Sequence, residues 1–275
     1  MLSICPVICS RNDSRDNNLR MVLTLRNMIN LYDEIIVVDY GSETPLHEPL
    51  ANLLPRTGKL RCITISPELA RQLNPSNPTT FMQVWAHNIG IRRATSDFIV
   101  STNNDVIIDR PEHIGINTMY TVARYNVPEQ VVYSLVNSPN YLESLRGMKG
   151  QFEKRPCINS ATETQYITHD PGDVWSLVVG AGDYQVAHRD IWYKIRGFEE
   201  SMINRGFDDS NLMKKASKFY KIDRLDLDVF HLDHPTNPSA NYILNNRVAY
   251  VNNFDETTNP ETWGFSELNI PEVLI

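Results

Sequence analysis

Three polar residues, Asn103, Asn104 and Asp105, interrupt an otherwise apolar stretch and could bind a ligand together. An apolar run, residues 98–100, leads up to them, and a second run, residues 106–108, follows directly. This pattern predicts a buried strand whose carboxyl end delivers amide and carboxylate groups to a sheet edge. Ligands bind at that edge in open α/β sheets. The alternative is an Asn-rich turn between two strands, because Asn and Asp are ordinary turn residues.

Two acids and two histidines further along the chain could also do chemistry. Asp208 and Asp209 open a predicted helix that runs to about residue 220, where they could simply cap the helix or could offer a carboxylate as a general base. The helix dipole is expected to lower the pKa of Asp209 and keep it ionised. His231 and His234 follow a strand predicted over residues 225–230. They are candidate metal ligands, or else packed or surface residues.

The first half of the sequence alternates strands and helices in a way that would position such a site. Residues 3–10, 34–39, 60–65 and 98–101 are predicted strands, and helical spacing predicts helices over 19–31 and 81–94, with Gly90 tolerated inside the second. Residues 67–80 are rich in Pro, Asn, Ser and Thr and are predicted to form a loop. Three successive βα units favour a doubly wound nucleotide-binding half.

The second half is less regular. Residues 131–136 are a predicted strand and residues 189–195 a predicted helix, whereas residues 137–168 show no clear period and could cover the site. The glycines Gly180 and Gly182 would let the chain approach a ligand closely. Trp175 and Trp192 could stack on a flat face of a ligand, although a buried core position is the commoner role of tryptophan.

Composition narrows the class of protein. The 275 residues carry a net charge of −7 and a pI near 5.5, which argues against a nucleic-acid binder because such proteins need a basic face. The four cysteines form no Cys-x-x-Cys pair, so a zinc site of that kind is not expected and a reducing compartment is favoured. Without a signal peptide or an apolar segment long enough to span a membrane, the sequence predicts a soluble, cytoplasmic protein.

Four stretches, in order, resemble the inverting glycosyltransferases that have the GT-A fold, of the family-2 type. EIIVVDYGS (34–42) is similar to the family's EIIVVDDGS, and AHNIGIRRATSDFIVSTNNDV (86–106) is similar to the segment that ends in the D-x-D motif. GAGDYQVAHRDIWYKIRGFEE (180–200) is similar to the acceptor-site segment that ends in Gly-Phe-Asp/Glu-Glu. GFDDSNL (206–212) is similar to the Glu-Asp motif of the catalytic base. The resemblance extends to about Pro238, and galactosyltransferase-like members share its second half.

The resemblance implies a Rossmann-like mixed sheet flanked by helices in a single α/β domain. That domain would span residues 1–238, with a nucleotide-sugar-binding half over 1–110 and an acceptor and catalytic half over 111–238. Residues 239–275 would form a C-terminal extension packed on the domain.

The resemblance also assigns roles on the donor side. The nucleotide sugar, with a UDP-sugar as the expected donor, would be bound by residues of the strand ends and the D-x-D turn: Ser10, Arg11, Asn12, Asp39, Asn88, Asn103, Asn104 and Asp105. Asp39 could instead cap the turn that follows it, and Arg92 or Arg93 could face phosphate or solvent. Asn103 replaces the first acid of D-x-D, so Asp105 is the motif's only charged ligand for Mn²⁺ or Mg²⁺. The third ligand of galactosyltransferase-like members falls on His231, with His234 as a nearby second candidate.

On the acceptor side, the resemblance makes Asp209 the base that activates a glycan hydroxyl, with Asp208 bonded to the acceptor sugar. Gly182 and Asp183 would also contact the sugars. Two alternatives remain: a retaining transferase of the same fold, which would not use Asp209 as base, and a non-catalytic sugar- or nucleotide-binding module. A nucleotidyltransferase is disfavoured because residues 10–16 do not form a Gly-rich, basic loop, and a Rossmann dehydrogenase because no Gly-x-Gly-x-x-Gly follows the first strand.

Overall fold

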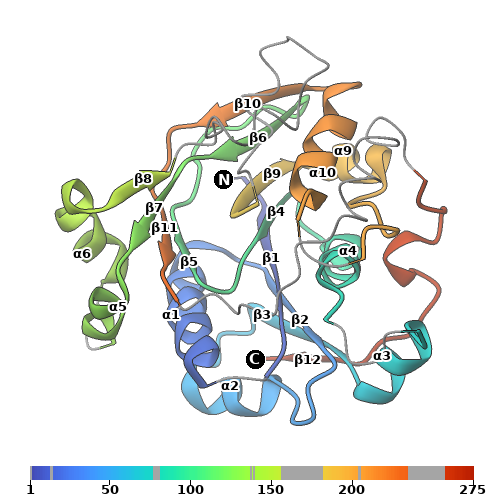
Figure 1. The fold of residues 1–275 in the computed structure, drawn as a ribbon, viewed down its shortest axis with the longest axis horizontal. Coiled ribbons are helices and arrows are strands. Elements are labelled where there is room, and N and C mark those ends of the chain that lie inside the picture. The colour runs from blue at the N-terminus through green and yellow to red at the C-terminus, as the bar shows by residue number, and fades with distance from the viewer. Residues whose placement is uncertain are drawn as a thin grey trace.

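Two β-sheets with helices packed around them form the molecule (Figure 1). The structure, a computed structural model, describes residues 2–12, 15–76, 81–136, 138, 140–155, 182–203, 206–234 and 258–275. The larger sheet has the order β10-β6-β9-β4-β1-β2-β3-β12. Its strands are β1 (Ile4–Ser10), β2 (Ile35–Tyr40), β3 (Leu60–Ile65), β4 (Phe98–Thr102), β6 (Thr118–Val122), β9 (Tyr184–His188), β10 (Lys221–Leu225) and β12 (Glu272–Leu274).

The smaller sheet has the order β5-β11-β7-β8 and carries two of the candidate ligands. Its strands are β5 (Val106–Ile108), β7 (Arg124–Val127), β8 (Glu153–Arg155) and β11 (Val229–Leu232). The helices are α1 (Arg15–Leu31), α2 (His47–Leu53), α3 (Pro67–Leu73), α4 (Gln83–Arg93), α5 (Glu129–Leu135), α6 (Tyr141–Met148), α9 (Arg189–Ile195) and α10 (Asp208–Ser217), with 3₁₀ turns at Lys149–Gln151 and Trp263–Phe265.

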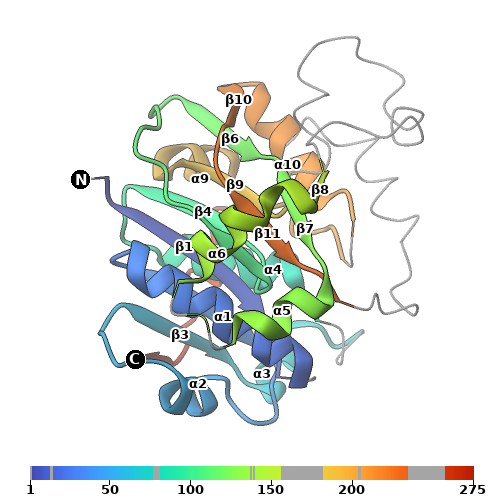
Figure 2. The same ribbon diagram turned by 90° about the vertical axis from the view of Figure 1, so that its left-hand side faces the viewer.

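The central strands β1, β2 and β4 of the larger sheet are buried on both faces, which explains their continuous apolar runs. Alternate residues of β1 enter different cores: Cys5 and Val7 pack with α4, α9 and α10, whereas Ile4 and Ile8 pack with α1 and α2. Figure 2, turned by 90°, shows α1 and α2 in front of these strands. Strands β1 to β4 are parallel and β9 runs antiparallel beside β4, so the sheet is mixed.

The strands and helices predicted for the first half are confirmed, apart from the segment 67–80, and α2 is an additional helix that was not predicted. The four predicted strands and the helices over 19–31 and 81–94 are present with small shifts of their ends. The predicted loop over 67–80 is wrong, because its first half forms α3: Ser66 accepts a hydrogen bond from the amide of Leu69 at 3.2 Å, and Pro67 occupies the first helical position.

Two predicted strands of the second half are also wrong. The apolar run 131–136 belongs to α5, where Val132 and Leu135 are buried one helical turn apart. The strand predicted over 225–230 is split between β10 and β11, which lie in different sheets, and Asp228 at the break pairs with Arg146 and Lys149.

Residues 258–275 pack against the larger sheet. Strand β12 pairs antiparallel with β3, and Trp263 is buried in the α4 core. Trp175, Gly180 and Cys157 lie outside the described residues, while Cys5, Cys9 and Cys62 are buried as predicted. In the part of the chain that the structure describes, each helix is too short or too polar to cross a membrane.

Candidate functional site

Asp105, His231 and His234 form a cluster that could hold a metal ion. Asp105 lies in the turn between β4 and β5, and β11 pairs antiparallel with β5 so that His231 is opposite Val106. The Nε2 atoms of His231 and His234 lie 3.5 and 3.1 Å from Oδ2 of Asp105. One potential ligand atom from each of the three residues lies within 4.8 Å of the others.

Asp105 is buried and the two histidines are half-buried, and protein groups satisfy only part of their hydrogen-bonding capacity. Asp105 is 7% exposed, and among the described residues its Oδ1 and the Nδ1 of His231 are buried without a hydrogen-bond partner. Burial opposes ionisation of Asp105, but the hydrogen bonds and charges of His231 and His234 outweigh it and hold its pKa well below the ordinary value. A buried carboxylate with two imidazoles is a donor set that fits a divalent cation.

The neighbouring asparagines tie this turn to adjacent strands. Asn104 donates from Nδ2 to the Oγ of Ser10 at 2.8 Å, and Asn103 donates from Nδ2 to Oδ1 of Asp183 at 3.0 Å. The other carboxylate oxygen of Asp183 forms an ion pair with Arg124 of β7. Asn103 stands at the position of the first acid of the D-x-D pattern, and it bonds the buried carboxylate of Asp183.

The acids of α10 lie beside the same edge of the larger sheet. A Cβ on Gly182 would lie 3.0 Å from Oδ2 of Asp209, and Gln185 of β9 donates to the backbone carbonyl of Asp209 at 3.3 Å. The charge of Asp208 acts on the thiol of Cys9, near the carboxyl end of β1. Phe207, which precedes the helix, has φ of 65°, an uncommon backbone conformation of the kind that clusters at functional sites.

The expected lowering of the pKa of Asp209 is wrong. Burial, and then the negative charges of Asp208 and Asp183, raise the pKa of Asp209 to about 7, although the amide of Ser210 donates to its Oδ1 at 2.8 Å. Desolvation and like charges thus outweigh the helix terminus. A carboxylate that titrates near neutrality is well suited to general base chemistry.

Two predicted donor-side residues are engaged in the framework. Asp39 is fully buried, and its two oxygens accept from the hydroxyl of Ser42 and from the amide of Leu46 at 2.8 Å, which is the arrangement that turn capping predicts. Asn88 of α4 is also fully buried and bonds the backbone of Phe198 at both ends of its amide, by Oδ1 at 2.8 Å and Nδ2 at 2.9 Å.

Arg11 and Asn12 follow β1, at the edge where the asparagine turn lies. The guanidinium of Arg11 lies 5.8 Å from the centre of the Phe81 ring, and the backbone N–H of Asn12 donates to the hydroxyl of Ser42 at 2.8 Å. Arg92 and Arg93 instead hold the C-terminal segment: Arg92 stacks on Trp263, and Arg93 donates to three of its carbonyls. Trp192 is fully buried in the core, as the commoner role of tryptophan predicts.

Two arginines next to the candidate site were missed from the sequence. Arg124 lies on β7 beside Asp183, and Arg20 of α1 is 2% exposed, with its guanidinium bonded to the carbonyl of Asp233. Arg20 falls in the buried stripe of α1 together with Leu23, Thr24 and Asn27, and this helical spacing was the one available signal. Nothing comparable distinguishes Arg124, because β7 was not predicted.

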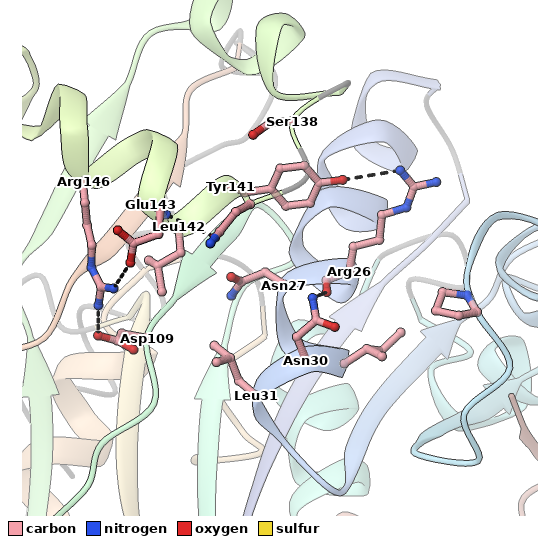
Figure 3. A pocket seen from close by; sticks show the side chains of 13 residues that line it. Arg26, Asn27, Asn30, Leu31, Asp109, Ser138, Tyr141, Leu142, Glu143 and Arg146 are labelled. Carbon is pink, nitrogen blue, oxygen red and sulfur yellow. Dashed lines mark hydrogen bonds and ion pairs between the residues drawn. The ribbon is translucent and has the colours of Figure 1, made fainter.

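A separate cavity lies away from the Asp105 cluster. A cavity of about 600 Å³ is lined by α1, α6 and Asp109 (Figure 3), and Asp109 follows β5 at the end opposite Asp105, roughly 13 Å away along an extended chain. Its polar side chains bond one another: Arg146 pairs with Asp109 and Glu143, and Arg26 donates to Tyr141. The Asp105 cluster, unlike this cavity, has a buried carboxylate oxygen and a buried imidazole nitrogen without a hydrogen-bond partner among the described residues, and is the stronger candidate site.

Comparison with known proteins identifies the fold. No family model and no curated protein matches the sequence. Among solved structures, the chain is similar to GalNAc-T7 with UDP, GalNAc and Mn²⁺ (TM-score 0.52, 11% identity, 84% of this chain and 44% of that chain). It is also similar to the mannosyltransferase PcManGT from Pyrobaculum calidifontis in complex with GDP-Man and Mn²⁺ (TM-score 0.53, 12% identity, 86% of this chain and 58% of that chain).

The chain therefore has the GT-A glycosyltransferase fold, which confirms the predicted mixed sheet flanked by helices. It spans about half the length of each of these two structures.

Proposed function

We propose that this chain is an inverting glycosyltransferase that moves a sugar from a nucleotide sugar, with a UDP-sugar as the expected donor, to a glycan hydroxyl. One observation carries the proposal: an Asp-His-His cluster around the buried Asp105 and a carboxylate with a pKa near 7 lie at one sheet edge. Asp183 connects them, because it bonds Asn103 next to Asp105 and lies beside Gly182, which abuts Asp209.

In this proposal Asp209 is the general base. It takes the proton from the acceptor hydroxyl while that oxygen forms a bond to the anomeric carbon of the donor. The bond from that carbon to the phosphate oxygen breaks, and the nucleotide diphosphate leaves with the electron pair. Attack from the face opposite the leaving group inverts the configuration.

A divalent cation held by Asp105, His231 and His234 would neutralise negative charge on the leaving diphosphate. Mn²⁺ suits this mixed set of imidazole and carboxylate ligands better than Mg²⁺ does. The negative charge of the Asp105 carboxylate makes it the ligand on which affinity for the cation depends most.

Most of the other candidate site residues would contact either the donor or the acceptor. We place Asn103 and Asn104 on the donor side because they share the turn of Asp105, and Ser10 with them because it accepts a hydrogen bond from Asn104. Arg11 and Asn12 would lie at the rim of this donor side. Asp183, Gly182 and Asp208 lie towards Asp209 and would face the sugars. Asp39 and Asn88 stabilise this sheet edge through the hydrogen bonds described above. They would not contact the donor directly.

The test is turnover of a panel of UDP-, GDP- and dTDP-sugars with and without Mn²⁺, comparing the unmodified protein with Asp105→Ala. We expect slow hydrolysis of one donor that needs the metal and is lost in the variant. Asp33→Ala, which removes a largely exposed acid, is the control and should leave turnover unchanged. Nucleotide binding that ignores Mn²⁺, without turnover, would reject the proposal in favour of a binding module.

Once a donor and an acceptor are known, the anomeric configuration of the product separates the two transferase classes. Inversion, with loss of transfer in Asp209→Asn, supports the proposed base. Retention of configuration would show that the protein is a retaining transferase, and Asp209 would then not be the base.

A further inference from the structure

A buried arginine of α1 lies directly behind the proposed metal ligands. The Nε and Nη2 atoms of Arg20 donate to the carbonyl of Asp233 at 3.1 and 2.7 Å, and Nη2 lies 3.5 Å from the carboxylate of Glu129 on α5. Figure 1 shows α1 beside β11 and α5 on the left of the molecule. A buried guanidinium is costly unless its donors are bonded, and here two nitrogens of the Arg20 guanidinium bond the same main-chain carbonyl, which is therefore held firmly.

The Asp233 carbonyl belongs to the peptide group that leads into His234. A peptide group is planar, so fixing the carbonyl of Asp233 also fixes the nitrogen and Cα of His234. The amide of Asp233 is held as well, since it donates to the carbonyl of Val127 at 2.9 Å. The path of the main chain into His234 is thus clamped from both sides.

This clamp matters because His234 lies beyond the β11 ladder. Strand β11 ends at Leu232, and the register gives β11 residues up to Leu232 a partner on β7. His231 is positioned by the ladder, whereas His234 depends on the peptide that Arg20 holds. The Nε2 of His234 nevertheless lies closer to Asp105, at 3.1 Å, than that of His231, at 3.5 Å.

We propose that Arg20 is a positioning residue that holds His234 in place as a metal ligand, so that the site binds its cation through two imidazoles. The proposal rests on the proposed function, since it assumes that Asp105, His231 and His234 bind a divalent metal. It adds a residue that touches neither metal nor sugar but sets how tightly the metal is held.

The experiment measures the affinity of the whole chain for Mn²⁺ alone, by electron paramagnetic resonance of the free ion. Arg20→Met is expected to weaken binding about tenfold, the usual effect of removing a group that orients a ligand, and Arg20→Lys to weaken it less. Arg26→Met is the matched control, because Arg26 lies on the same helix but donates to Tyr141 and Leu53. It should leave Mn²⁺ affinity unchanged. Thermal unfolding of each variant without metal shows which of them are folded.

A double variant separates positioning from a general effect on the fold. In a His234→Ala background, Arg20→Met should cause no further loss of affinity, because the side chain it positions is already absent. An equal loss in both backgrounds, or unchanged affinity in Arg20→Met, overturns the proposal for Arg20.

Asp105→Ala keeps this outcome distinct from a failure of the proposed function. If the unmodified chain binds Mn²⁺ and Asp105→Ala does not, the metal site stands whatever the Arg20 variants show. If the unmodified chain binds no Mn²⁺, the metal site and the role of Arg20 are overturned together.

Discussion

Asp209 makes activity and stability depend on pH in opposite directions. An aspartate in an unfolded chain titrates at about 3.9, whereas burial and the charges of Asp208 and Asp183 raise the pKa of Asp209 in the folded protein to about 7. Between about pH 4 and pH 7, the folded protein therefore keeps a proton on Asp209 that the unfolded chain has released. The stability due to this proton is fully present below about pH 4 and is lost as the pH rises through about 7.

We therefore expect kcat/KM for transfer to rise with pH and level off above about 7, as Asp209 becomes ionised. Asp209→Asn should lower transfer by about 10²- to 10⁴-fold while raising the free energy of unfolding more at pH 8 than at pH 5. Asp190→Asn, in the exposed first turn of α9, serves as the control for both measurements. A variant that loses stability at pH 8 would contradict the raised pKa.

Asn103 suits its neighbour Asp183, because its side-chain amide donates a hydrogen bond to that carboxylate. Restoring the acid of the D-x-D pattern with Asn103→Asp would replace a donor 3.0 Å from Oδ1 of Asp183 by a second carboxylate. We expect a loss of about 1–3 kcal/mol in the free energy of unfolding at pH 8, measured with urea, and a smaller loss at pH 4, where carboxylates begin to protonate. Asn103→Ala, which removes the bond without adding charge, separates the two effects. Equal losses in both variants would argue against repulsion from Asp183.

The sequence pattern could predict Asp105, Asp209 and His231 as site residues. It could not predict the contacts that hold the site together. Asp105 and Asp209 stand at ends of elements that the apolar pattern predicts, so their arrival at one sheet edge follows from the topology. Arg20 and Asp233 lie 213 residues apart, and they are in contact only because β11 pairs with β5 beside α1. The pKa of Asp209 depends on burial and on Asp183, which a helix-terminus rule does not include.

At the scale of elements, α4 approaches β1 closely enough that a helix glycine is required. A Cβ on Gly90 would lie 2.4 Å from Cγ1 of Val7 and 3.0 Å from Cγ2 of Val38. The sequence suggested only that glycine is tolerated at this position. The structure shows that its missing side chain lets the helix pack against two parallel strands that lead to the site.

Gly90→Ala should therefore lower the free energy of unfolding by about 1–3 kcal/mol through overpacking, in spite of the better helix propensity of alanine. Gly147 of α6 offers the matched control, since a Cβ there meets nothing within 4 Å. Gly147→Ala should raise stability by about 0.5–1 kcal/mol. Urea unfolding of both variants measures the difference, and a stabilised Gly90→Ala protein would show that α4 can move away from β1.

The elements that sequence reasoning misassigned share a physical cause. In α5, a short apolar run rich in valine fits either a strand or one turn of a buried helix. At the β10–β11 break, residues 225–229 alternate between apolar and acidic types as a single strand would. In both places, contacts with neighbouring elements decide the structure. In α3, a cap and a proline start a short helix inside a segment whose composition indicates a loop. The parallel strands of the first half were easier to predict because burial on both faces makes them continuously apolar.

At the scale of the whole molecule, residues 258–275 are joined to the elements that carry the site. Lys215 of α10 donates to the carbonyl of Gly197 at 2.9 Å and lies 3.7 Å from the buried carboxylate of Glu199. Glu199 in turn accepts from the amide of Thr258 at 3.2 Å. The helix that begins with Asp208 and Asp209 is thus connected, through its last turn, to the C-terminal segment.

If this segment belongs to the same cooperative unit, damage to it should destabilise the entire sheet. Trp263→Ala removes a buried side chain from the α4 core and should lower the free energy of unfolding by about 3–5 kcal/mol. Circular dichroism and tryptophan fluorescence should report one coincident urea transition, shifted to lower concentration in the variant. Phe219→Ala, which truncates a side chain that is 53% exposed, should shift it little. Two separate transitions in Trp263→Ala would mean that the segment unfolds by itself, and that α10 does not depend on it to present Asp209.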